Sequence, residues 1–289
     1  MTSQSSPVPR LEAFAPGAAL VTGAAGGIGL ALSRALAQAG MAVAMADIDE
    51  DSLGARAQEL QSHGHRVLAL RLDVTDRAAW EQAADRVEED LGPLHVLCNN
   101  AGLSALGMTV ADMDDAYWDL TMRVNLDSVF AGSRVAARRM AARGRGHLVN
   151  TASISALGLC SAGTAAYAAS KYAVMGLSEV LRQELAPQGV GVSVLCPGPV
   201  RTNLWKSTRR LRGLPELDMP PADSLRGSAS PTALDPDLVA RGVVAAIARN
   251  QFLVVTHPEF GARIGARHEE LSRQLRAWTS LTQVDAAIA

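Results

Sequence analysis

The stretch that decides the fold is 18-AALVTGAAGGIGLALSRALAQAG-40, where an apolar run, a glycine-rich turn and an amphipathic segment follow one another. The apolar run predicts a buried strand, and the helical period at 30–39 predicts a helix. Gly23, Gly27 and Gly29 permit a tight turn and the approach of backbone to a phosphate at the helix N-terminus. The spacing departs from GxGxxG, so a purely architectural strand-to-helix turn is the alternative interpretation.

The alternation of apolar and amphipathic segments continues along the chain. Strand-like runs lie at Ala18–Thr22, Met41–Ala46, Val67–Leu72, Leu94–Asn99, His147–Ala152, Val190–Cys196 and Phe252–Val255. Helical stretches lie at about 30–39, 51–62, 76–91, 112–142, 165–187 and 235–249. Strands that alternate with helices imply parallel pairing, and continuous apolar strands imply a sheet covered on both faces. We therefore expect an α/β fold, a single-domain doubly wound parallel sheet of about seven strands with helices on both faces.

Three segments depart from this alternation. Residues 1–17 are polar and rich in proline, which predicts a flexible N-terminal tail and leaves 18–289 as one domain. The segment 203–234 contains four prolines and shows no strong periodicity. Long irregular connections often cover binding sites, so we expect a lid there, with a surface insertion of no function as the alternative. A C-terminal helix is expected at about 258–281.

Composition excludes several classes of protein. The chain has 289 residues, 48% of them hydrophobic, and a formal net charge of −2, so a large core is expected and a nucleic-acid partner is not. No signal peptide and no apolar run of about 18 residues is found, which predicts a cytoplasmic protein without a membrane partner. Cys98, Cys160 and Cys196 lack metal-ligand spacing, so neither a metal site nor a disulfide framework is expected.

A carboxylate ends the second predicted strand. Asp47 follows Gly27 by 20 residues, where it can accept hydrogen bonds from the hydroxyls of an adenosine ribose. A 2′-phosphate at this place would meet like charge, and the neighbouring Ile48 provides no compensating cation. Asp47 and Ile48 together favour NAD over NADP, although an aspartate at a strand end is also a common cap.

Together with motifs further along, these residues resemble the short-chain dehydrogenase/reductase family, in the branch with TGxxxGxG and YxxxK. The resemblance runs from about residue 18 to 202 and keeps the family's order of motifs. The motifs that carry it are TGAAGGIG at 22–29, Asp73-Val74, NNAG at 99–102, Asn125, Ser153, YAASK at 167–171 and PGPVRT at 197–202. Seven motifs in register make a chance resemblance negligible.

The resemblance implies a Rossmann-type catalytic domain that transfers a hydride between a nicotinamide cofactor and a CH–OH carbon. Its implied catalytic residues are Asn125, Ser153, Tyr167 and Lys171. Tyr167 would act as acid/base, Ser153 would bind the substrate oxygen, and Asn125 would hold a water linked to Lys171. Lys171 lies four residues after Tyr167, on one helix face, and an ammonium nearby lowers the pKa of a phenol. Ser155 is the alternative to Ser153.

The resemblance also implies which residues bind the cofactor. They are Gly23, Gly27, Ile28, Gly29, Asp47, Ile48, Asp73, Val74, Asn100, Ala101, Gly102, Tyr167, Lys171, Pro197, Gly198, Val200 and Thr202. Lys171 would hold the hydroxyls of the nicotinamide ribose, and Thr202 would fix the nicotinamide carboxamide.

The family's substrate pocket is lined by the segment after the serine strand and by the lid. The candidate pocket residues here are Ser153, Leu157, Leu159, Cys160 and Tyr167. The segment 154–163 is apolar and small, which predicts a hydrophobic secondary alcohol or ketone as substrate. An NADPH-dependent reductase of a biosynthetic ketone or 3-oxoacyl thioester is the alternative, followed by a non-catalytic NAD(H)-binding sensor.

Three further expectations concern assembly and isolated side chains. Family members commonly pair through the helices that correspond to 112–142 and 165–187, so a homodimer or homotetramer is expected. The arginines of the lid, Arg209, Arg210 and Arg212, either meet an anionic substrate or are solvated charges. A lone histidine after a strand is more often a cap or a surface residue, and this is the expectation for His257.

Overall fold

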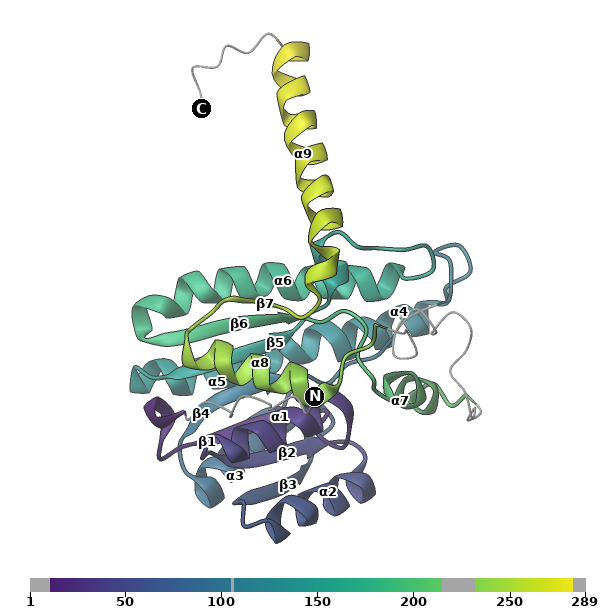
Figure 1. Cartoon of the computed structure of the whole chain (residues 1–289). Coiled ribbons are helices and arrows are strands. Elements are labelled where there is room, and N and C mark those ends of the chain that lie inside the picture. Colours follow the sequence, from purple (N-terminus) through teal and green to yellow (C-terminus); the bar gives the residue numbers. More distant parts are fainter. Residues whose placement is uncertain (1–10, 105–106, 215–231, 283–289) are drawn as a thin grey trace, which may run out of the picture.

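The computed structural model describes residues 11–104, 107–214 and 232–282 and places them in one α/β domain (Figure 1). Its centre is a seven-stranded parallel sheet in the order β3-β2-β1-β4-β5-β6-β7. The strands are β1 (Ala18–Thr22), β2 (Ala42–Asp47), β3 (Val67–Arg71), β4 (Leu94–Asn99), β5 (Gly146–Thr151), β6 (Val190–Cys196) and β7 (Leu253–Val255). The predicted fold class is confirmed, and the strand ends differ from the expected ones by one residue at most.

Helices cover both faces of this sheet (Figure 1). The first face carries α1 (Gly27–Gln38), α2 (Glu50–Ser62) and α8 (Pro236–Ala248), and the second carries α3 (Ala79–Leu91), α5 (Ser128–Arg143) and α6 (Ala165–Leu185). The remaining helices are α4 (Asp115–Met122), α7 (Leu204–Leu211) and α9 (Gly261–Thr282). Short helical turns are η1 (Glu12–Phe14), η2 (Arg123–Asp127), η3 (Ile154–Leu157), η4 (Ala186–Gln188) and η6 (Pro258–Phe260).

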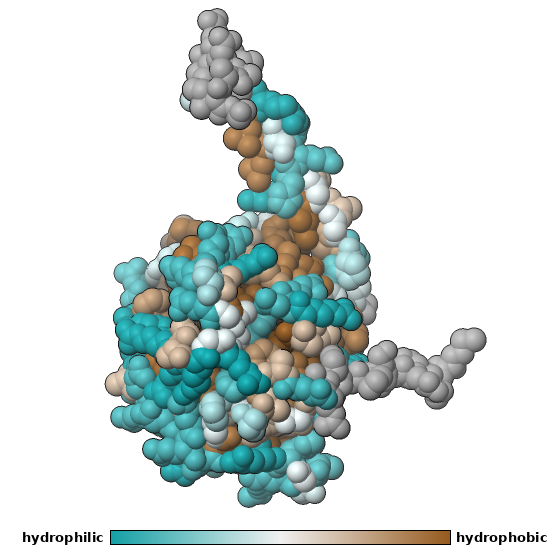
Figure 2. Space-filling model, turned by 90° about the vertical axis from the view of Figure 1, so that its left-hand side faces the viewer, coloured by the Kyte–Doolittle hydropathy of each residue, from teal (hydrophilic) through white to brown (hydrophobic). Residues whose placement is uncertain are grey.

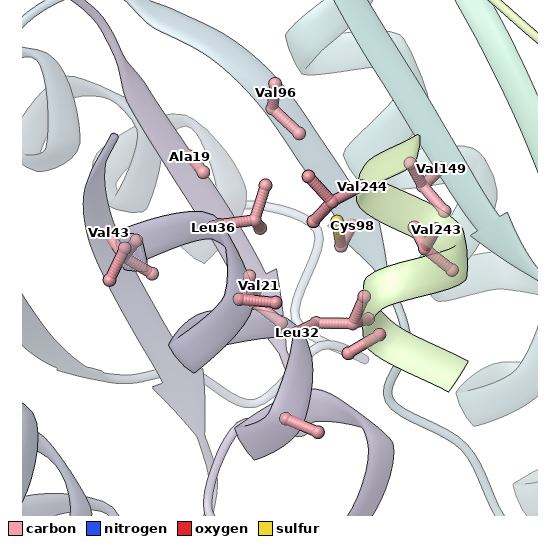
Figure 3. Packing of buried hydrophobic residues seen from close by; sticks show 14 of the residues in the cluster. Ala19, Val21, Leu32, Leu36, Val43, Val96, Cys98, Val149, Val243 and Val244 are labelled. Atoms are coloured by element: carbon pink, nitrogen blue, oxygen red, sulfur yellow. The ribbon is translucent and has the colours of Figure 1, made fainter. Parts of the chain in front are cut away.

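The core of the first face lies between α1, α8 and the middle of the sheet (Figure 3). Leu32 and Leu36 of α1 meet Val243 and Val244 of α8, and all four side chains are fully buried. Truncating a leucine in such surroundings costs about 2–5 kcal/mol. This packing fixes α1, and therefore the glycine turn at its start, against β1.

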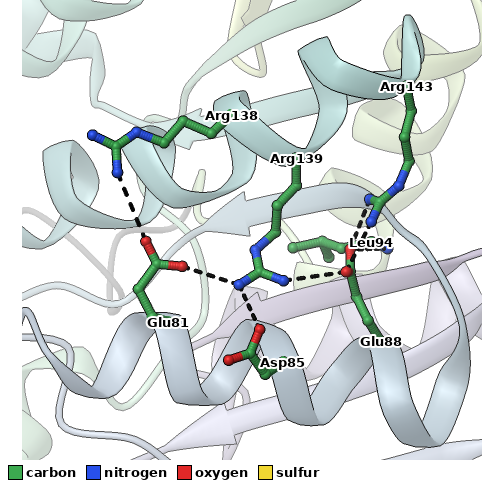
Figure 4. A network of polar contacts seen from close by, with 7 residues as sticks. All are labelled: Glu81, Asp85, Glu88, Leu94, Arg138, Arg139 and Arg143. Atoms are coloured by element: carbon green, nitrogen blue, oxygen red, sulfur yellow. Dashed lines mark hydrogen bonds and ion pairs between the residues drawn. The ribbon is translucent and has the colours of Figure 1, made fainter.

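An ion-pair network ties α3 to α5 on the second face (Figure 4). Arg139 of α5 pairs with Glu81 at 3.0 Å, Asp85 at 2.7 Å and Glu88 at 3.1 Å. Burial opposes the ionisation of Glu88, but hydrogen bonds from Arg143 and from the Leu94 amide hold its pKa below the ordinary value. Glu88 thereby connects both helices to the start of β4.

Part of the segment that the sequence assigned to the N-terminal tail packs against the sheet. Leu11 is buried, and its amide donates to the Ala39 carbonyl at 3.2 Å. The Phe14 carbonyl lies 2.9 Å from Nδ1 of His95, and the Phe14 ring contacts His147 edge-on. Among the described residues, the packed chain therefore begins at Leu11.

Two other segments differ from the sequence expectation. The helix expected over 112–142 is divided by the π-helical turn η2, in which the hydrogen bonds span one more residue than in an α-helix. The lid region, expected to lack periodicity, forms the amphipathic helix α7, which buries Trp205 and Thr208. Residues 215–231 of the expected lid lie outside the described residues.

The C-terminal helix α9 projects away from the domain (Figure 1). Hydrophobic residues gather where this helix leaves the domain and continue along it (Figure 2), and Leu271 and Leu275 are exposed. Within the described part of the chain, no helix is long and apolar enough to span a membrane.

We predict that acidification weakens the fold through His147, whose Nε2 lies 2.7 Å from the Ser193 hydroxyl. Burial lowers the pKa of His147 to about 4. The unfolded chain takes up this proton near pH 6.5 and the folded chain only near 4, so the free energy of unfolding falls as pH falls between these values. Urea denaturation should show a loss of about 3 kcal/mol from this residue.

The matched variant is His147→Gln, which keeps a polar atom near the Nε2 position and does not titrate. Its free energy of unfolding should fall less than that of the wild type between pH 7 and pH 4. Equal losses in the two proteins would contradict the assignment to His147.

Candidate functional site

Most of the sequence-predicted site residues meet at the carboxyl ends of the central strands. The glycine turn follows β1, NNAG ends and follows β4, Ser153 follows β5, and PGPVRT follows β6. The strand order reverses between β1 and β4, and crevices for ligands form at such a reversal in α/β sheets. The topology therefore brings together motifs from across the chain.

The glycine turn is folded too tightly for side chains. Gly23 and Gly27 have positive φ angles of 67° and 53°. A Cβ atom on Gly29 would collide with the Gly23 carbonyl and lie 2.7 Å from Nδ2 of Asn100. Helix α1 begins here without a side-chain cap, so its first backbone N–H groups face no capping oxygen. The turn fits a phosphate-bearing ligand at the positive end of α1.

The NNAG segment is tied to the end of β1. The Thr22 hydroxyl accepts hydrogen bonds from the amides of Asn100 at 3.0 Å and Ala101 at 3.1 Å. The Asn100 side chain donates to the Thr22 carbonyl at 2.9 Å. At Gly102, a Cβ would lie 3.2 Å from Oδ1 of Asn125 and 3.6 Å from Nζ of Lys171. Gly102 thus lets the backbone approach two predicted catalytic residues.

Asn125 is fully buried in the π-helical turn η2. Its Oδ1 accepts from the Leu103 amide at 2.7 Å, and its Nδ2 donates to the Leu103 carbonyl at 3.1 Å and to the Ser170 hydroxyl at 3.2 Å. Such turns inside helices frequently occur at functional sites. Here the turn directs Asn125 between the chain after β4 and helix α6, and the sequence pattern gave no sign of it.

Helix α6 supplies the tyrosine and the lysine. Lys171 is 4% exposed, and its Nζ donates to the Thr151 carbonyl at 2.8 Å. The same atom lies 5.7 Å from the centroid of the Tyr167 ring. A hydrogen bond with Ser153 acts to lower the pKa of Tyr167, and the Ser155 hydroxyl lies 3.3 Å from that of Ser153.

The electrostatics of this pair differ from the expectation. Burial raises the pKa of Tyr167, and the hydrogen bond with Ser153 opposes that increase. Burial lowers the pKa of Lys171 to about 8. The expected lowering of the tyrosine pKa is not found, because the desolvation of the buried phenol outweighs the hydrogen bond with Ser153.

Asp47 and Ile48 lie at the end of β2, close to the glycine turn. One oxygen of Asp47 accepts from the Ala25 amide at 3.0 Å, and the other accepts from the Asp49 amide at 3.0 Å. Ile48 is exposed. Arg210 of α7 pairs with Asp49 at 2.8 Å, a contact that sequence reasoning missed because 161 residues separate the partners.

Asp73 and Val74 hold their own turn after β3. The Asp73 carboxylate accepts from the amide of Thr75 at 2.9 Å and from its hydroxyl at 2.7 Å. Val74 is buried, and its carbonyl accepts from the Trp80 indole at 3.0 Å. Both residues are therefore anchored in the structure at the edge where the adenine end of a dinucleotide is expected.

The PGPVRT segment after β6 reaches the glycine turn. The methyl group of Thr202 lies 3.0 Å from the position of a Cβ on Gly27. Val200 is buried and bridges to Leu234. His257 occupies the N-cap position of η6 but makes no side-chain cap bond, and it is buried rather than on the surface.

The expected substrate-pocket residues lie in and after η3. Leu157 is half-buried against the cluster that contains Val174 and Met175. Leu159 is partly buried, and Cys160 is exposed with its thiol 3.5 Å from the Ser155 carbonyl.

Arginines of α9 and of the lid contact other parts of the domain. Arg267 of α9 lies against Gly158, where it occupies the space of a Cβ. On the lid, Arg212 stacks 3.9 Å from the centroid of the Tyr117 ring. Arg210 and Arg212 thus contact other parts of the protein instead of standing as isolated charges.

Known proteins resemble this chain over most of its length. A family model described as short chain dehydrogenase matches residues 17–212. The chain is 37% identical over 260 residues to 1-deoxy-11-beta-hydroxypentalenate dehydrogenase of Streptomyces exfoliatus, covering 89% of each. It is 38% identical over 194 residues to 3beta-hydroxysteroid dehydrogenase 2 of Eggerthella lenta, covering 66% of this chain and 74% of that protein.

A solved structure shares the whole architecture. It is a short-chain dehydrogenase/reductase from Burkholderia phymatum in complex with NAD, with a TM-score of 0.82 and 34% identity. The match covers 91% of this chain and 96% of that one.

We predict that burying the Lys171 ammonium costs stability in the ligand-free protein. Between pH 8 and 10.5 the unfolded chain keeps this proton and the folded chain releases it, so the free energy of unfolding rises with pH. Relative to Lys171→Met, the wild type should gain about 3 kcal/mol across this window in urea denaturation.

Lys206→Met is the matched control, because Lys206 is the only other lysine and is exposed. The stability difference between this variant and the wild type should stay constant over the same pH range. A constant difference for Lys171→Met as well would contradict the cost assigned to Lys171.

Proposed function

The chain belongs to the short-chain dehydrogenase/reductase family of oxidoreductases, and we propose that it transfers a hydride between NAD and a hydrophobic secondary alcohol or ketone. The observation that carries this proposal is the cluster of Ser153, Tyr167 and Lys171, with Lys171 near Gly102 of the segment that packs on the glycine turn. Ser153 and Tyr167 are joined by a hydrogen bond, and the lysine amine is buried behind them. This cluster supports a site at which a proton is exchanged with the substrate oxygen.

The residues at the glycine turn fit a dinucleotide. The glycines of the turn expose backbone N–H groups that no side chain covers. Asp47 lies at the end of the neighbouring strand, where the adenosine ribose would bind. NAD, when bound, supplies the hydride acceptor for alcohol oxidation. Gly102 keeps the backbone beside Lys171 and Asn125 free of a side chain, which leaves room for a ligand there.

We assign the proton transfer to Tyr167, with Ser153 holding the substrate oxygen. Lys171 uses one of its three protons on the Thr151 carbonyl, which leaves two for a ribose hydroxyl and a water. A positive charge at Lys171 favours the phenolate form of Tyr167 when the substrate's proton is taken. The Asn125 amide binds Leu103 and Ser170 and so fixes the chain after β4 against α6, and a water between Asn125 and Lys171 stays a prediction.

The preference for NAD rests on charge at the end of β2. The Asp47 carboxylate would repel a 2′-phosphate, and Arg210 of the lid is already paired with Asp49. The solved relative from Burkholderia phymatum contains NAD, which supports the same choice.

The substrate class is proposed from the apolar segment after Ser153 and from the relatives. Leu157 and Leu159 offer hydrophobic walls, and the relatives named above are a hydroxypentalenate and a hydroxysteroid dehydrogenase. A hydrophobic cyclic secondary alcohol fits both observations. Assembly as a homodimer or homotetramer and a cytoplasmic location remain predictions.

We predict that Tyr167→Phe lowers kcat for alcohol oxidation by about 10²–10⁴-fold, because it removes the proton acceptor and little else. The dissociation constant for NADH, followed by nicotinamide fluorescence, should change by less than about threefold. Tyr172→Phe is the control on the same helix, with an exposed side chain. Turnover by Tyr167→Phe at the control's rate would contradict the assignment.

We predict that Asp47→Asn narrows the preference for NADH over NADPH by about tenfold or more, since it removes the charge that repels a 2′-phosphate. The ratio of the two dissociation constants is the measurement. Asp51→Asn removes an exposed carboxylate of the same helix-capping region and should leave the ratio unchanged. An unchanged ratio in Asp47→Asn would instead show that this carboxylate only caps its turn.

A further inference from the structure

A buried imidazole that the proposed chemistry does not use lies against the PGPVRT segment. His257 follows β7 and is 1% exposed. Its ring contacts Gly198, which lies just after β6, the strand next to β7 in the sheet. In the proposed function, the segment that contains Gly198 supports the nicotinamide end of the cofactor.

Nδ1 is the ring nitrogen that faces the Gly198 peptide. Nδ1 of His257 lies 3.2 Å from the Gly198 amide and 2.6 Å from the Thr256 hydroxyl. The Gly198 N–H also points to the Thr256 oxygen at 3.2 Å. A backbone N–H is only a donor, so the Gly198 amide donates to Nδ1 and shares its hydrogen with the Thr256 oxygen. The imidazole therefore holds the Gly198 amide by a hydrogen bond.

The other side of the ring has no polar anchor. Nε2 is buried and has no hydrogen-bond partner among the described residues. Phe260 packs against the ring at a centroid distance of 5.9 Å. The orientation of the ring and that of the Gly198 peptide are consequently fixed by one another through Nδ1.

The absence of a side chain at Gly198 makes this contact possible. A Cβ at that position would lie 2.7 Å from both Cγ and Nδ1 of His257. That separation is shorter than van der Waals contact, so the ring would have to move. The glycine of this segment is thus required by the histidine as much as by any ligand.

We propose that His257 is a positioning residue, whose Nδ1 holds the Gly198 amide and so sets the backbone that supports the nicotinamide. The inference rests on the proposed function, because it needs the nicotinamide to lie on this segment. It predicts a larger effect on the nicotinamide end of the cofactor than on the rest, since the contact of this segment with the glycine turn is made by Thr202 and not by Gly198.

The test compares two probes, NADH and ADP-ribose, by calorimetric titration of the full chain. ADP-ribose lacks the nicotinamide and reports on the rest of the site. His257→Asn places an amide oxygen near the Nδ1 position, whereas His257→Gln places its polar atoms near Nε2. His63→Gln, at an exposed position after α2, is the matched control.

We expect His257→Gln to bind NADH about tenfold more weakly than wild type, the usual effect of losing one hydrogen bond, and to bind ADP-ribose within about twofold. His257→Asn and the control should bind both probes within about twofold of wild type. Gly198→Ala, which displaces the ring, should behave like His257→Gln and serves if that variant fails to fold.

Three results would overturn the inference. In the first, His257→Gln and Gly198→Ala bind NADH with wild-type affinity. In the second, these variants lose as much affinity for ADP-ribose as for NADH. In the third, His257→Asn and His257→Gln lose the same affinity for NADH. A wild-type protein that binds neither probe would overturn the proposed function itself. Binding of ADP-ribose by every variant separates the failure of the inference from that case.

Discussion

The burial of one ammonium group is the constraint on which the site depends. Lys171 lies inside the protein, where a charge is costly, and a single backbone carbonyl of β5 compensates it at 2.8 Å. Because burial lowers its pKa to about 8, the amine is poised to gain or lose a proton near neutral pH. An ordinary surface lysine would have neither this position nor this pKa. The burial of Lys171 costs stability and holds its amine 5.7 Å from the centroid of the Tyr167 ring.

A buried polar ladder keeps the elements of the site in register. The Asn99 amide donates to Asn150 at 2.9 Å and to Ser133 at 3.1 Å, and the Asn150 amide donates to Ser178 at 3.0 Å. These bonds join β4, α5, β5 and α6 through the interior, where a misplaced polar group would be left unpaired. The ladder therefore resists sliding of α6, on which Tyr167 lies, relative to the strands that carry the cofactor motifs.

Local pattern was enough to predict the sheet and its motifs. Apolar runs with strict boundaries marked the strands, and the positive φ angle of Gly23 matches the turn expected there. Contacts between distant residues were not predictable. The Arg210–Asp49 pair and the Gly198–His257 contact depend on packing that no spacing encodes. The π-turn at Asn125 was not predicted, because the sequence indicated one continuous helix over 112–142.

Titration of the wild-type protein with NADH and with NADPH, followed by nicotinamide fluorescence, tests the central claim most directly. It requires no knowledge of the alcohol. The account predicts NADH binding with NADPH at least about tenfold weaker, a difference of about 1.4 kcal/mol. Tighter binding of NADPH would contradict the role given to Asp47, and binding of neither would leave the glycine turn as an architectural feature.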